Sequence, residues 1–490
     1  MVDGALAEAV RSLMPRARRE LAELVAFRSV ANPSLFPVEE CRASARWVAD
    51  ALAAEGVPDV RLLEVPDGST AVYGHLPGPD GAPTVLLYAH HDVQPPLDEA
   101  AWTSPPFELT ERDGRWYGRG AADCKGNILM HLTALRALRQ VAGVKRDGAT
   151  GVRAVGEGLA GEAVAPLPVT VKVIVDGSEE QGTGGLERYV AAHPELLAAD
   201  AIVVGDAGNF ATGVPTATTS LRGTVVLRVT VRTLAGNLHS GQFGGAAPDA
   251  LAALIRLLDG LRDEHGGTAV PGLESYQAWE GLEYPEGRFR EDAGVLDGVE
   301  LIGTGSVADR LWARPAITVV GIDAPSVDGA VPAIQSRARA LLSLRVPPGT
   351  DAEAARRALV SHLEGAAPWG ARVEVEPWGT PAQPMRADTS GPAYAALGEA
   401  MREAFGREMV LAGQGGSIPL CELLRRTYPE AEMVLLGVED PGARIHAVDE
   451  SVDPGELERM ALAEALFLRG YAARWTGRPA RRSGVGAAGA

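Results

Sequence analysis

Histidine and acidic residues stand directly after an apolar segment of the sequence, in positions from which they could bind a metal ion. His90 and Asp92 follow the uncharged run 84–89, which is typical of a buried strand of an α/β sheet. Because side chains alternate along a strand, His90 and Asp92 point the same way and His91 points the opposite way. A neutral imidazole is a good zinc ligand, and a nearby carboxylate can fix its tautomer. A strand end with solvated polar residues is the alternative for this stretch taken alone.

Acidic residues occupy the same kind of position at three further places. Asp123 stands at or near the expected start of a helix, where capping alone would explain a carboxylate in most proteins. Glu179 and Glu180 follow a second apolar strand pattern, and Asp206 follows a third. Each placement could arise by chance, but all of them together indicate one site at the carboxyl edge of a sheet.

His446, in a loop after a predicted strand, would add a second imidazole, although a lone loop histidine is more often a surface residue. Two imidazoles and three carboxylates suit a pair of divalent ions, with one histidine on each ion and one carboxylate bridging them. Zinc is the first expectation, with manganese or cobalt as alternatives. Glu179 is the expected base for the attacking water, and Asp92 the group that orients His90. The candidate metal ligands are His90, Asp123, Glu180, Asp206 and His446.

The elements that must position these residues form an α/β pattern. Apolar periodicity predicts two opening amphipathic helices, and then strands and helices at 60–65, 71–76, 84–90, 121–141, 169–175, 185–198 and 201–205. From about residue 215 the pattern changes to strand, helix, two strands, helix and strand, which is the ferredoxin-like order. These six elements are expected at 222–231, 248–261, 316–322, 338–346, 351–365 and 372–377. The larger α/β pattern then resumes with a helix at 392–405 and a strand at 432–437.

This order predicts a smaller α+β domain inserted into a larger α/β domain. The predicted boundaries are a catalytic domain at 1–214 and 382–476, an inserted lid at 215–381, and a disordered tail at 477–490. Residues 142–167 are expected to form a surface insertion, and residues 266–315 show no clear pattern.

The composition is that of a soluble globular protein of more than one domain. The 490 residues are 46% hydrophobic and carry a formal net charge of −18, which argues against nucleic acid or an anionic membrane as a partner. The three widely spaced cysteines, Cys41, Cys124 and Cys421, suggest a reducing compartment without a disulfide framework. With no signal-peptide pattern and no apolar run of membrane-spanning length, a cytoplasmic protein is expected.

Several multi-residue motifs resemble those of the aminoacylase, carboxypeptidase and carnosinase-type metallopeptidase family, in the same order along the chain. They are His90-x-Asp92-Val93-x-Pro95, Gly118-Arg119-Gly120-Ala121-x-Asp123-x-Lys125-Gly126, Glu179-Glu180-x-Gly182, Asp206, Leu238-His239-Ser240-Gly241, Gly415-Gly416-Ser417-Ile418-Pro419 and His446. The resemblance extends over residues 6–472. It implies a two-metal peptidase domain and an inserted ferredoxin-like lid through which subunits form a homodimer.

The resemblance also implies a role for individual residues. Asp123 would bridge the two ions, His90 and Asp206 would complete one site, and Glu180 and His446 would complete the other. Glu179 would be the general base, with Asp92 holding the first imidazole. In the lid, His239 matches a histidine that reaches the partner's active site and helps stabilise the oxyanion. Arg345 resembles an arginine that binds the terminal carboxylate of the substrate, near the glycine loop that contains Gly416 and Ser417.

The implied function is metal-dependent hydrolysis of dipeptides or short peptides with a free C-terminal carboxylate. Departures from the family pattern leave the substrate open: His91 stands where a tyrosine is frequent, and residues 329–332 lack an asparagine that many dipeptidases use. Hydrolysis of N-acyl amino acids or another small amide, in a biosynthetic or catabolic pathway, is the alternative. A non-catalytic binding module on the same fold is a remote alternative, because such a protein would have no reason to keep Glu179.

Overall fold

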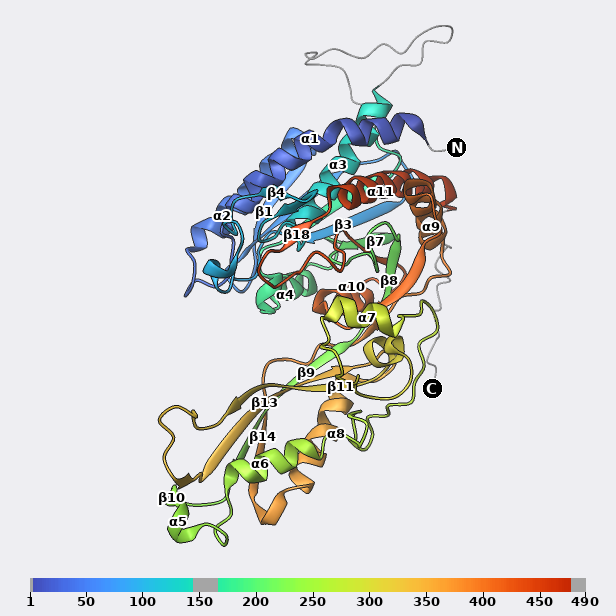
Figure 1. The fold of residues 1–490 in the computed structure, drawn as a ribbon. Helices are drawn as coiled ribbons and strands as arrows, with labels where there is room; N and C mark the ends of the chain where they lie inside the picture. The colour runs from blue at the N-terminus through green and yellow to red at the C-terminus, as the bar shows by residue number, and fades with distance from the viewer. Residues whose placement is uncertain (1–2, 144–165, 477–490) are drawn as a thin grey trace, which may run out of the picture. The chain divides into compact units, whose positions relative to one another are not determined.

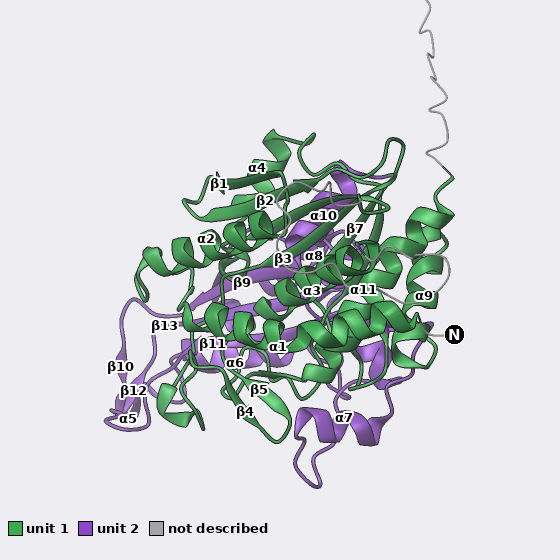
Figure 2. Cartoon of the chain, turned by 90° about the horizontal axis from the view of Figure 1, so that it is seen from above, with its two compact units in different colours: residues 1–215, 389–409, 430–490 green, residues 216–388, 410–429 purple. Residues whose placement is uncertain are grey.

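The computed structural model describes residues 3–143 and 166–476. Almost all of the predicted surface insertion and the whole of the predicted tail therefore lie outside the described residues. The chain forms two compact units (Figure 2). Unit 1 comprises residues 1–215, 389–409 and 430–490, and unit 2 comprises residues 216–388 and 410–429. The domain boundaries predicted from the sequence, after residues 214 and 381, remain predictions.

Unit 1 contains the strands of a sheet in which four parallel neighbours end at one edge. In spatial order they are β1 (Asp59–Glu64), β2 (Thr70–Leu76), β6 (Thr170–Asp176), β3 (Thr84–His90), β7 (Ala201–Gly205) and β17 (Glu432–Leu436). β3 is parallel to β6 and β7, and β7 is parallel to β17, whereas β1 and β2 are antiparallel neighbours. β3 is buried after its first residue, as its continuous apolar sequence predicts. The ends of four parallel strands can therefore deliver side chains to one place.

The helices of unit 1 pack around these strands. They are α1 (Gly4–Ala26), α2 (Val38–Ala54), α3 (Lys125–Ala142), α4 (Gly185–Ala192), α9 (Pro392–Phe405) and α11 (Pro454–Arg474). α3 is buried from its start to Leu138, because it packs against α1, α11 and β3 (Figure 1). Its buried His131 lies 2.7 Å from the carboxylate of Glu464 on α11, so the polar groups inside this layer are paired.

The helix predicted at 185–198 is too long. In the structure α4 ends at Ala192, two residues before Pro194. A proline disfavours helical backbone at the residue before it, and it removes a backbone donor, so the helix stops there. The chain then runs irregularly to the start of β7.

A small three-stranded sheet in unit 1 joins two segments that are far apart in the sequence. It consists of β4 (Thr110–Arg112), β5 (Arg115–Tyr117) and β18 (Ser451–Val452). Ser451 pairs with Tyr117, and Gly118 donates its N–H to the carbonyl oxygen of Glu450 at 2.9 Å. The motif that precedes α3 is thereby fixed beside the loop that precedes β18.

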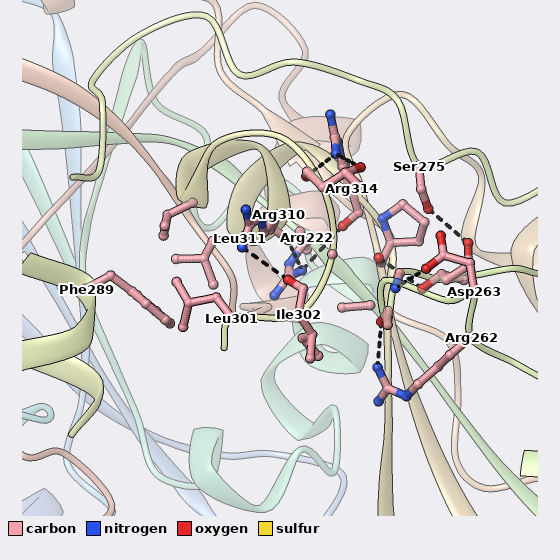
Figure 3. Close-up of a pocket in the computed structure, with 18 residues that line it drawn as sticks. Arg222, Arg262, Asp263, Ser275, Phe289, Leu301, Ile302, Arg310, Leu311 and Arg314 are labelled. Carbon is pink, nitrogen blue, oxygen red and sulfur yellow. Dashed lines mark hydrogen bonds between the residues drawn. The ribbon is translucent and has the colours of Figure 1, made fainter. Parts of the chain in front are cut away.

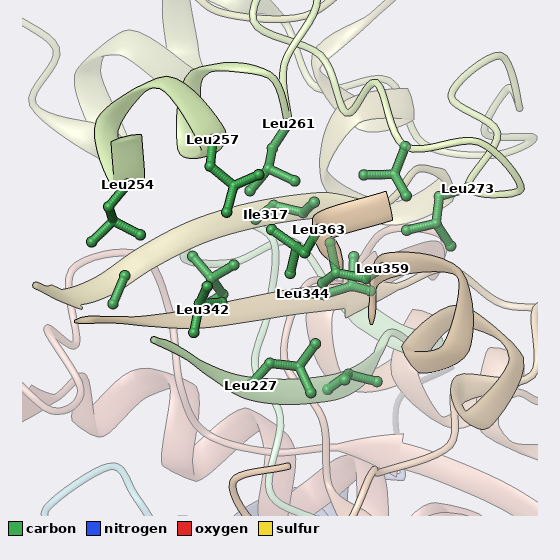
Figure 4. Close-up of a cluster of buried hydrophobic side chains, with 14 of the residues drawn as sticks. Leu227, Leu254, Leu257, Leu261, Leu273, Ile317, Leu342, Leu344, Leu359 and Leu363 are labelled. Carbon is green, nitrogen blue, oxygen red and sulfur yellow. The ribbon is translucent and has the colours of Figure 1, made fainter. Parts of the chain in front are cut away.

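Unit 2 contains the predicted ferredoxin-like arrangement. Its elements are β9 (Gly223–Arg232), α6 (Ala250–Asp259), β11 (Ala316–Asp323), β13 (Arg337–Val346), α8 (Ala352–Gly365) and β14 (Arg372–Pro377). The antiparallel strand order is β11-β13-β9-β14. Buried residues alternate along β13, and the leucines of this face pack with leucines of α6 and α8 (Figure 4). One apolar face of a twisted sheet covered by two helices is sufficient for a separate core.

Other parts of unit 2 were not predicted. Within residues 266–315 the structure has the helix α7 (Glu286–Ala293) among irregular segments. The short elements of unit 2 are β8 (Thr216–Leu221), β10 (Leu238–His239), α5 (Ser240–Phe243), β12 (Ala333–Ile334), β15 (Met385–Arg386), β16 (Val410–Gln414) and α10 (Pro419–Thr427). β8 pairs with β15 and with β16, so residues 410–429 belong structurally to unit 2.

Candidate metal and catalytic site

The five predicted metal ligands converge in unit 1. His90 ends β3, Glu180 follows β6 and Asp206 follows β7, so three of them stand at the shared edge of the parallel strands. Asp123 lies two residues before α3, and His446 lies in the loop between β17 and β18. The side chains of His90, Asp123, Glu180 and Asp206 are 0–9% exposed, whereas that of His446 is 52% exposed.

Asp123 stands between the two imidazoles. Its Oδ1 lies 3.0 Å from His90 Nε2, and its Oδ2 lies 2.9 Å from His446 Nε2. The two rings therefore face opposite oxygens of one carboxylate. This is the arrangement that a carboxylate shared by two cations requires, because each oxygen can then serve a different ion.

Each imidazole also faces a second carboxylate. His90 Nε2 lies 3.3 Å from Asp206 Oδ1, and His446 Nε2 lies 3.2 Å from Glu180 Oε2. Two sets result, each with one imidazole nitrogen and two carboxylate oxygens, and they share Asp123. Nitrogen and oxygen donors of this kind suit zinc and similar divalent ions.

Cys124 is close enough to be considered as a further ligand, since its sulfur groups with His90 and Asp206. Its thiol, however, donates a hydrogen bond to the carbonyl oxygen of Gly205 at 2.9 Å. Burial raises the pKa of Cys124 to about 12. A thiol must lose its proton to bind a metal, so Cys124 is better suited to a structural role.

Buried negative charge exceeds positive charge at this edge of the sheet. The carboxylates concerned are Asp92, Asp123, Glu179, Glu180, Asp206 and Glu439. Among the described residues, only the two imidazoles form ion pairs with them. One buried oxygen, Oε1 of Glu180, has no hydrogen-bond partner. Buried carboxylates without cations are unstable, so the residues present fit a pair of divalent metal ions.

The pKa shifts of the candidate ligands also result from burial and from the close contact of carboxylates with imidazoles. Burial raises the pKa of Glu180 and of Asp206. Hydrogen bonds with Asp123 and Glu180 raise the pKa of His446 to about 10. Burial would also raise the pKa of Asp123, but hydrogen bonds from the two imidazoles lower it overall. These shifts arise where carboxylate oxygens and imidazole nitrogens meet, which are the atoms that would face a cation.

Asp92 supports both the first imidazole and the predicted base. His90 Nδ1 lies 3.0 Å from the main-chain oxygen of Asp92 and 3.4 Å from its Oδ1. The same carboxylate accepts the N–H groups of Glu179 and Glu180, each at 3.1 Å. Burial and the neighbouring carboxylate of Asp206 raise the pKa of Glu179 well above its usual value, which is the direction that a general base needs.

An ion pair between Arg119 and Glu450, which the sequence analysis did not identify, fixes the backbone near Asp123. Arg119 Nη1 donates to Glu450 Oε2 at 2.6 Å, and both side chains are 1% exposed. Glu450 Oε1 accepts the N–H groups of Ala122 and Asp123, each at 3.1 Å. Arg119 Nη2 donates to the carbonyl oxygen of Ala447 at 3.1 Å. The pair therefore connects the backbone of the shared carboxylate to the loop that carries the second imidazole.

Glu439 is a second residue that the sequence analysis missed. It follows β17 closely, and its carboxylate lies within 4.8 Å of ligand atoms of Asp123 and Asp206. Burial raises its pKa well above the usual value, and both neighbouring carboxylates add to the shift. Its position after an apolar strand is the same signal that pointed to His90 and Asp206, so this signal could have identified it.

The predicted substrate residues lie in unit 2. Arg345 is half-buried on β13 and donates from Nη1 to Thr224 Oγ1 at 2.6 Å and to Ser417 Oγ at 3.3 Å. Gly416 is next to Ser417 in the loop before α10. Among the described residues, no carboxylate forms an ion pair with Arg345. Its guanidinium is therefore free to bind an anion.

His239 is not close to Arg345 within this chain. Arg345 pairs with Thr224 at the start of β9, whereas His239 follows the other end of β9, in the pair β10–β12 (Figure 1). Thr224 and Arg232 are eight positions apart along β9, which is roughly 25 Å at ~3.3 Å per residue. Gly241 N–H donates to His239 Nδ1 at 3.1 Å, so Nε2 carries the ring hydrogen and is available as a donor.

Carboxylates and imidazoles stand together at the edge of the parallel strands, and a ferredoxin-like unit is also present. These two features define a class of metal-dependent hydrolases, and the sequence motifs belong to the same class. The profile of the family "Peptidase family M20/M25/M40" matches residues 86–149 and 146–469. The chain belongs to this family.

Individual relatives match over nearly the whole chain. A Cysteinylglycine-S-conjugate dipeptidase of Corynebacterium striatum is 45% identical over 94% of this chain and 97% of its own length. The human Beta-Ala-His dipeptidase is 27% identical over 93% of this chain and 86% of its own length. The structure of human carnosine dipeptidase 1 has a TM-score of 0.77 and 25% identity, covering 96% of this chain and 98% of that one. Dug1p of Saccharomyces cerevisiae, with a TM-score of 0.78 and 20% identity over 96% of this chain and 98% of its own, has the same fold.

Glu450→Gln is expected to weaken metal binding although Glu450 is not a predicted ligand. The substitution removes the charge that pairs with Arg119 and disturbs the N–H groups that fix Asp123. Loss of such a supporting group reduces metal affinity by roughly 10–100-fold in other metalloproteins. Zinc affinity can be measured by competition with a chromophoric chelator.

Glu464→Gln is the matched control, because Glu464 is also buried and paired, with His131, but contacts no predicted ligand. It should bind zinc as the wild type does. Wild-type zinc affinity in a folded Glu450→Gln protein would contradict the supporting role of the Arg119–Glu450 pair.

Proposed function

We propose that this enzyme hydrolyses the amide bond of dipeptides that have a free C-terminal carboxylate. The observation that carries the proposal is the position of Asp123 between two imidazoles, beside a buried glutamate that is not needed as a ligand. The names of the relatives add support, since the two most informative ones are called dipeptidases. A relative of the cysteinylglycine-S-conjugate type makes S-substituted cysteinylglycine the first substrate to test.

Two zinc ions are the proposed cofactors. His90, Asp123 and Asp206 would hold one ion, and Asp123, Glu180 and His446 the other. When bound, the ions supply Lewis-acid polarisation and make water more acidic. The buried carboxylate excess and the unpartnered Oε1 of Glu180 support this assignment. Manganese or cobalt would fit the same donor atoms.

Glu179 is the proposed general base. Its raised pKa favours uptake of a proton from the attacking water, and the same carboxyl group can then protonate the leaving amine. Asp92 fixes the two peptide N–H groups at this turn, and so determines where Glu179 stands. Arg345 is the proposed anchor of the substrate carboxylate, because neutral hydroxyl oxygens hold it and leave its charge unpaired.

We also propose a homodimer in which His239 serves the active site of the partner subunit. The pairing partner of Arg345, Thr224, lies roughly 25 Å along β9 from Arg232, the end of the strand that leads to His239. If Arg345 and His239 both contact one substrate, we therefore propose that they come from different chains. The free Nε2–H of His239 would then stabilise the oxyanion of the tetrahedral intermediate.

None of the helices in the described part of the chain is long and apolar enough to cross a bilayer. A cytoplasmic location is proposed because the three cysteines of the sequence, Cys41, Cys124 and Cys421, are widely spaced and predict no disulfide framework.

Glu179→Gln is expected to keep the metal and lose the reaction. The substitution removes proton transfer without removing a ligand, and the loss of a general base lowers kcat by roughly 10²–10⁴-fold. Metal content and turnover of S-benzyl-cysteinylglycine should be measured on the same preparation. Glu180→Gln is the control at the next position, and it should lose metal and activity together. Metal-free Glu179→Gln protein would instead show that Glu179 is a ligand.

Arg345→Ala should remove the preference for a free carboxylate. In the wild type, S-benzyl-cysteinylglycine should exceed its C-terminal amide in kcat/KM by a factor of about 10² or more, since one charge-assisted contact contributes ~1.5–3 kcal/mol and a missing partner leaves a buried charge unpaired. In Arg345→Ala the acid should slow while the amide changes little. Equal kcat/KM for acid and amide in the wild type would exclude this anchor and favour a general small-amide hydrolase.

Subunit mixing tests the position of His239. Inactive His239→Ala protomers and inactive Glu179→Gln protomers should regain part of the activity when they exchange, because one of the two sites in the hybrid has both residues intact. Exchange can be followed with differently tagged protomers. Inactive hybrids, with exchange demonstrated, would show that His239 does not act across the subunit boundary.

A further inference from the structure

Unit 2 contains a cavity that none of the predicted site residues lines. Its volume is about 250 Å³, and its walls are formed by Arg222 and by parts of residues 262–316, the region in which the sequence showed no pattern. Phe289, Leu301 and Leu311 line it together with arginine side chains (Figure 3). Drug-sized sites measure roughly 300–1,000 Å³, so a ligand of this cavity must be smaller.

Four arginines line the cavity, and each of them donates hydrogen bonds to carbonyl oxygens. Arg222 donates to the carbonyl oxygens of Gly415, Arg310 and Arg314 at 3.2–3.4 Å. Arg262 donates to those of Gly266 at 3.0 Å and Ile317 at 2.6 Å.

The remaining two arginines are held in a similar way. Arg310 donates to the carbonyl oxygen of Gly305 at 2.7 Å. Arg314 donates to that of Gln277 at 2.7 Å and also forms a long ion pair with Asp309 at 3.8 Å. A carbonyl oxygen satisfies a donor but does not neutralise a guanidinium charge.

One acidic side chain, Asp263, stands among the lining residues against the four arginines. Asp263 accepts the main-chain N–H groups of His265 at 2.9 Å and Gly267 at 2.8 Å. The cavity therefore carries an excess of positive charge inside a chain whose formal net charge is −18. Arg222 is 7% exposed, and burial together with the nearby Arg345 lowers its pKa to about 10, so it still carries its charge at neutral pH.

We propose that this cavity binds a small organic monocarboxylate that has an apolar body and no amino group. The apolar walls favour a hydrocarbon body, and the unneutralised guanidinium groups favour an anion. An ammonium group would be repelled by the same arginines, so free amino acids and dipeptides fit poorly. The cavity is thereby distinguished from a site for the proposed substrate or its products.

Isothermal titration calorimetry on the metal-loaded enzyme tests this proposal with three matched probes: 3-phenylpropanoate, its amide, and L-phenylalanine. The acid should bind saturably, and the amide and the amino acid should bind at least about tenfold more weakly, since each lacks a net negative charge. Arg345→Ala should bind 3-phenylpropanoate as the wild type does, because Arg345 does not line the cavity.

Two variants test the location. Val307→Phe adds a ring at a lining position and should weaken binding of the acid by about tenfold or more. Arg310→Gln removes one lining charge and should weaken it by about fivefold, whereas Arg310→Lys should restore most of the affinity. Arg356→Gln is the control, because Arg356 lies on α8 and pairs with Glu353 outside the cavity.

The result that would overturn the proposal is wild-type affinity for 3-phenylpropanoate in both Val307→Phe and Arg310→Gln. Loss of binding in Arg345→Ala, with Val307→Phe unaffected, would also overturn it by placing the acid at the substrate anchor. The proposal would also be overturned if millimolar 3-phenylpropanoate gave no saturable heat of binding to the wild type. If Val307→Phe fails to fold, the comparison of Arg310→Gln with Arg310→Lys decides the question.

Discussion

The excess of buried carboxylates around Asp123 is the constraint on which the rest of unit 1 depends. Burying several negative charges at the edge of one sheet is unfavourable unless cations share the space. The parallel strands bring the carboxylates together because their ends coincide, and the two imidazoles alone cannot neutralise them. The Arg119–Glu450 pair then fixes the shared carboxylate through its own backbone rather than through its side chain, which leaves both oxygens of Asp123 available. Fold and metal binding are thus two aspects of one electrostatic arrangement.

Unit 2 contains an excess of positive charge, carried by arginine side chains. Arg222 is buried and Arg345 half-buried, and hydroxyl or carbonyl oxygens hold them where carboxylates would be expected. Ser417 connects them, since it contacts the Arg345 guanidinium and donates to the main-chain oxygen of Arg222. Close packing limits this region as well: a side chain at Gly415 would meet the Arg222 guanidinium at 2.8 Å. Cations would neutralise the carboxylates of unit 1, and a carboxylate would neutralise the arginines of unit 2.

The sequence was most informative where local pattern and function coincide. The apolar runs before His90 and Asp206 made the strands predictable, together with the candidate ligands at their ends. The strand and helix order predicted the ferredoxin-like unit. Glu450 and Arg119 could not be paired from the sequence, because 331 positions separate them and the small sheet β4-β5-β18 brings them together. The segment at 266–315 gave no pattern because loops and short turns, rather than long amphipathic elements, form the cavity walls. The overlong helix prediction ending at 198 ignored the local effect of Pro194.

The proposal that Asp123 is shared by two metal ions can be tested by anomalous diffraction from crystals of the metal-loaded enzyme. Data should be collected on both sides of the zinc absorption edge. We expect two zinc peaks per chain on opposite sides of Asp123, one next to His90 and Asp206 and the other next to His446 and Glu180. A single peak per chain, or peaks that do not contact Asp123, would contradict a shared carboxylate as the organising feature of the site.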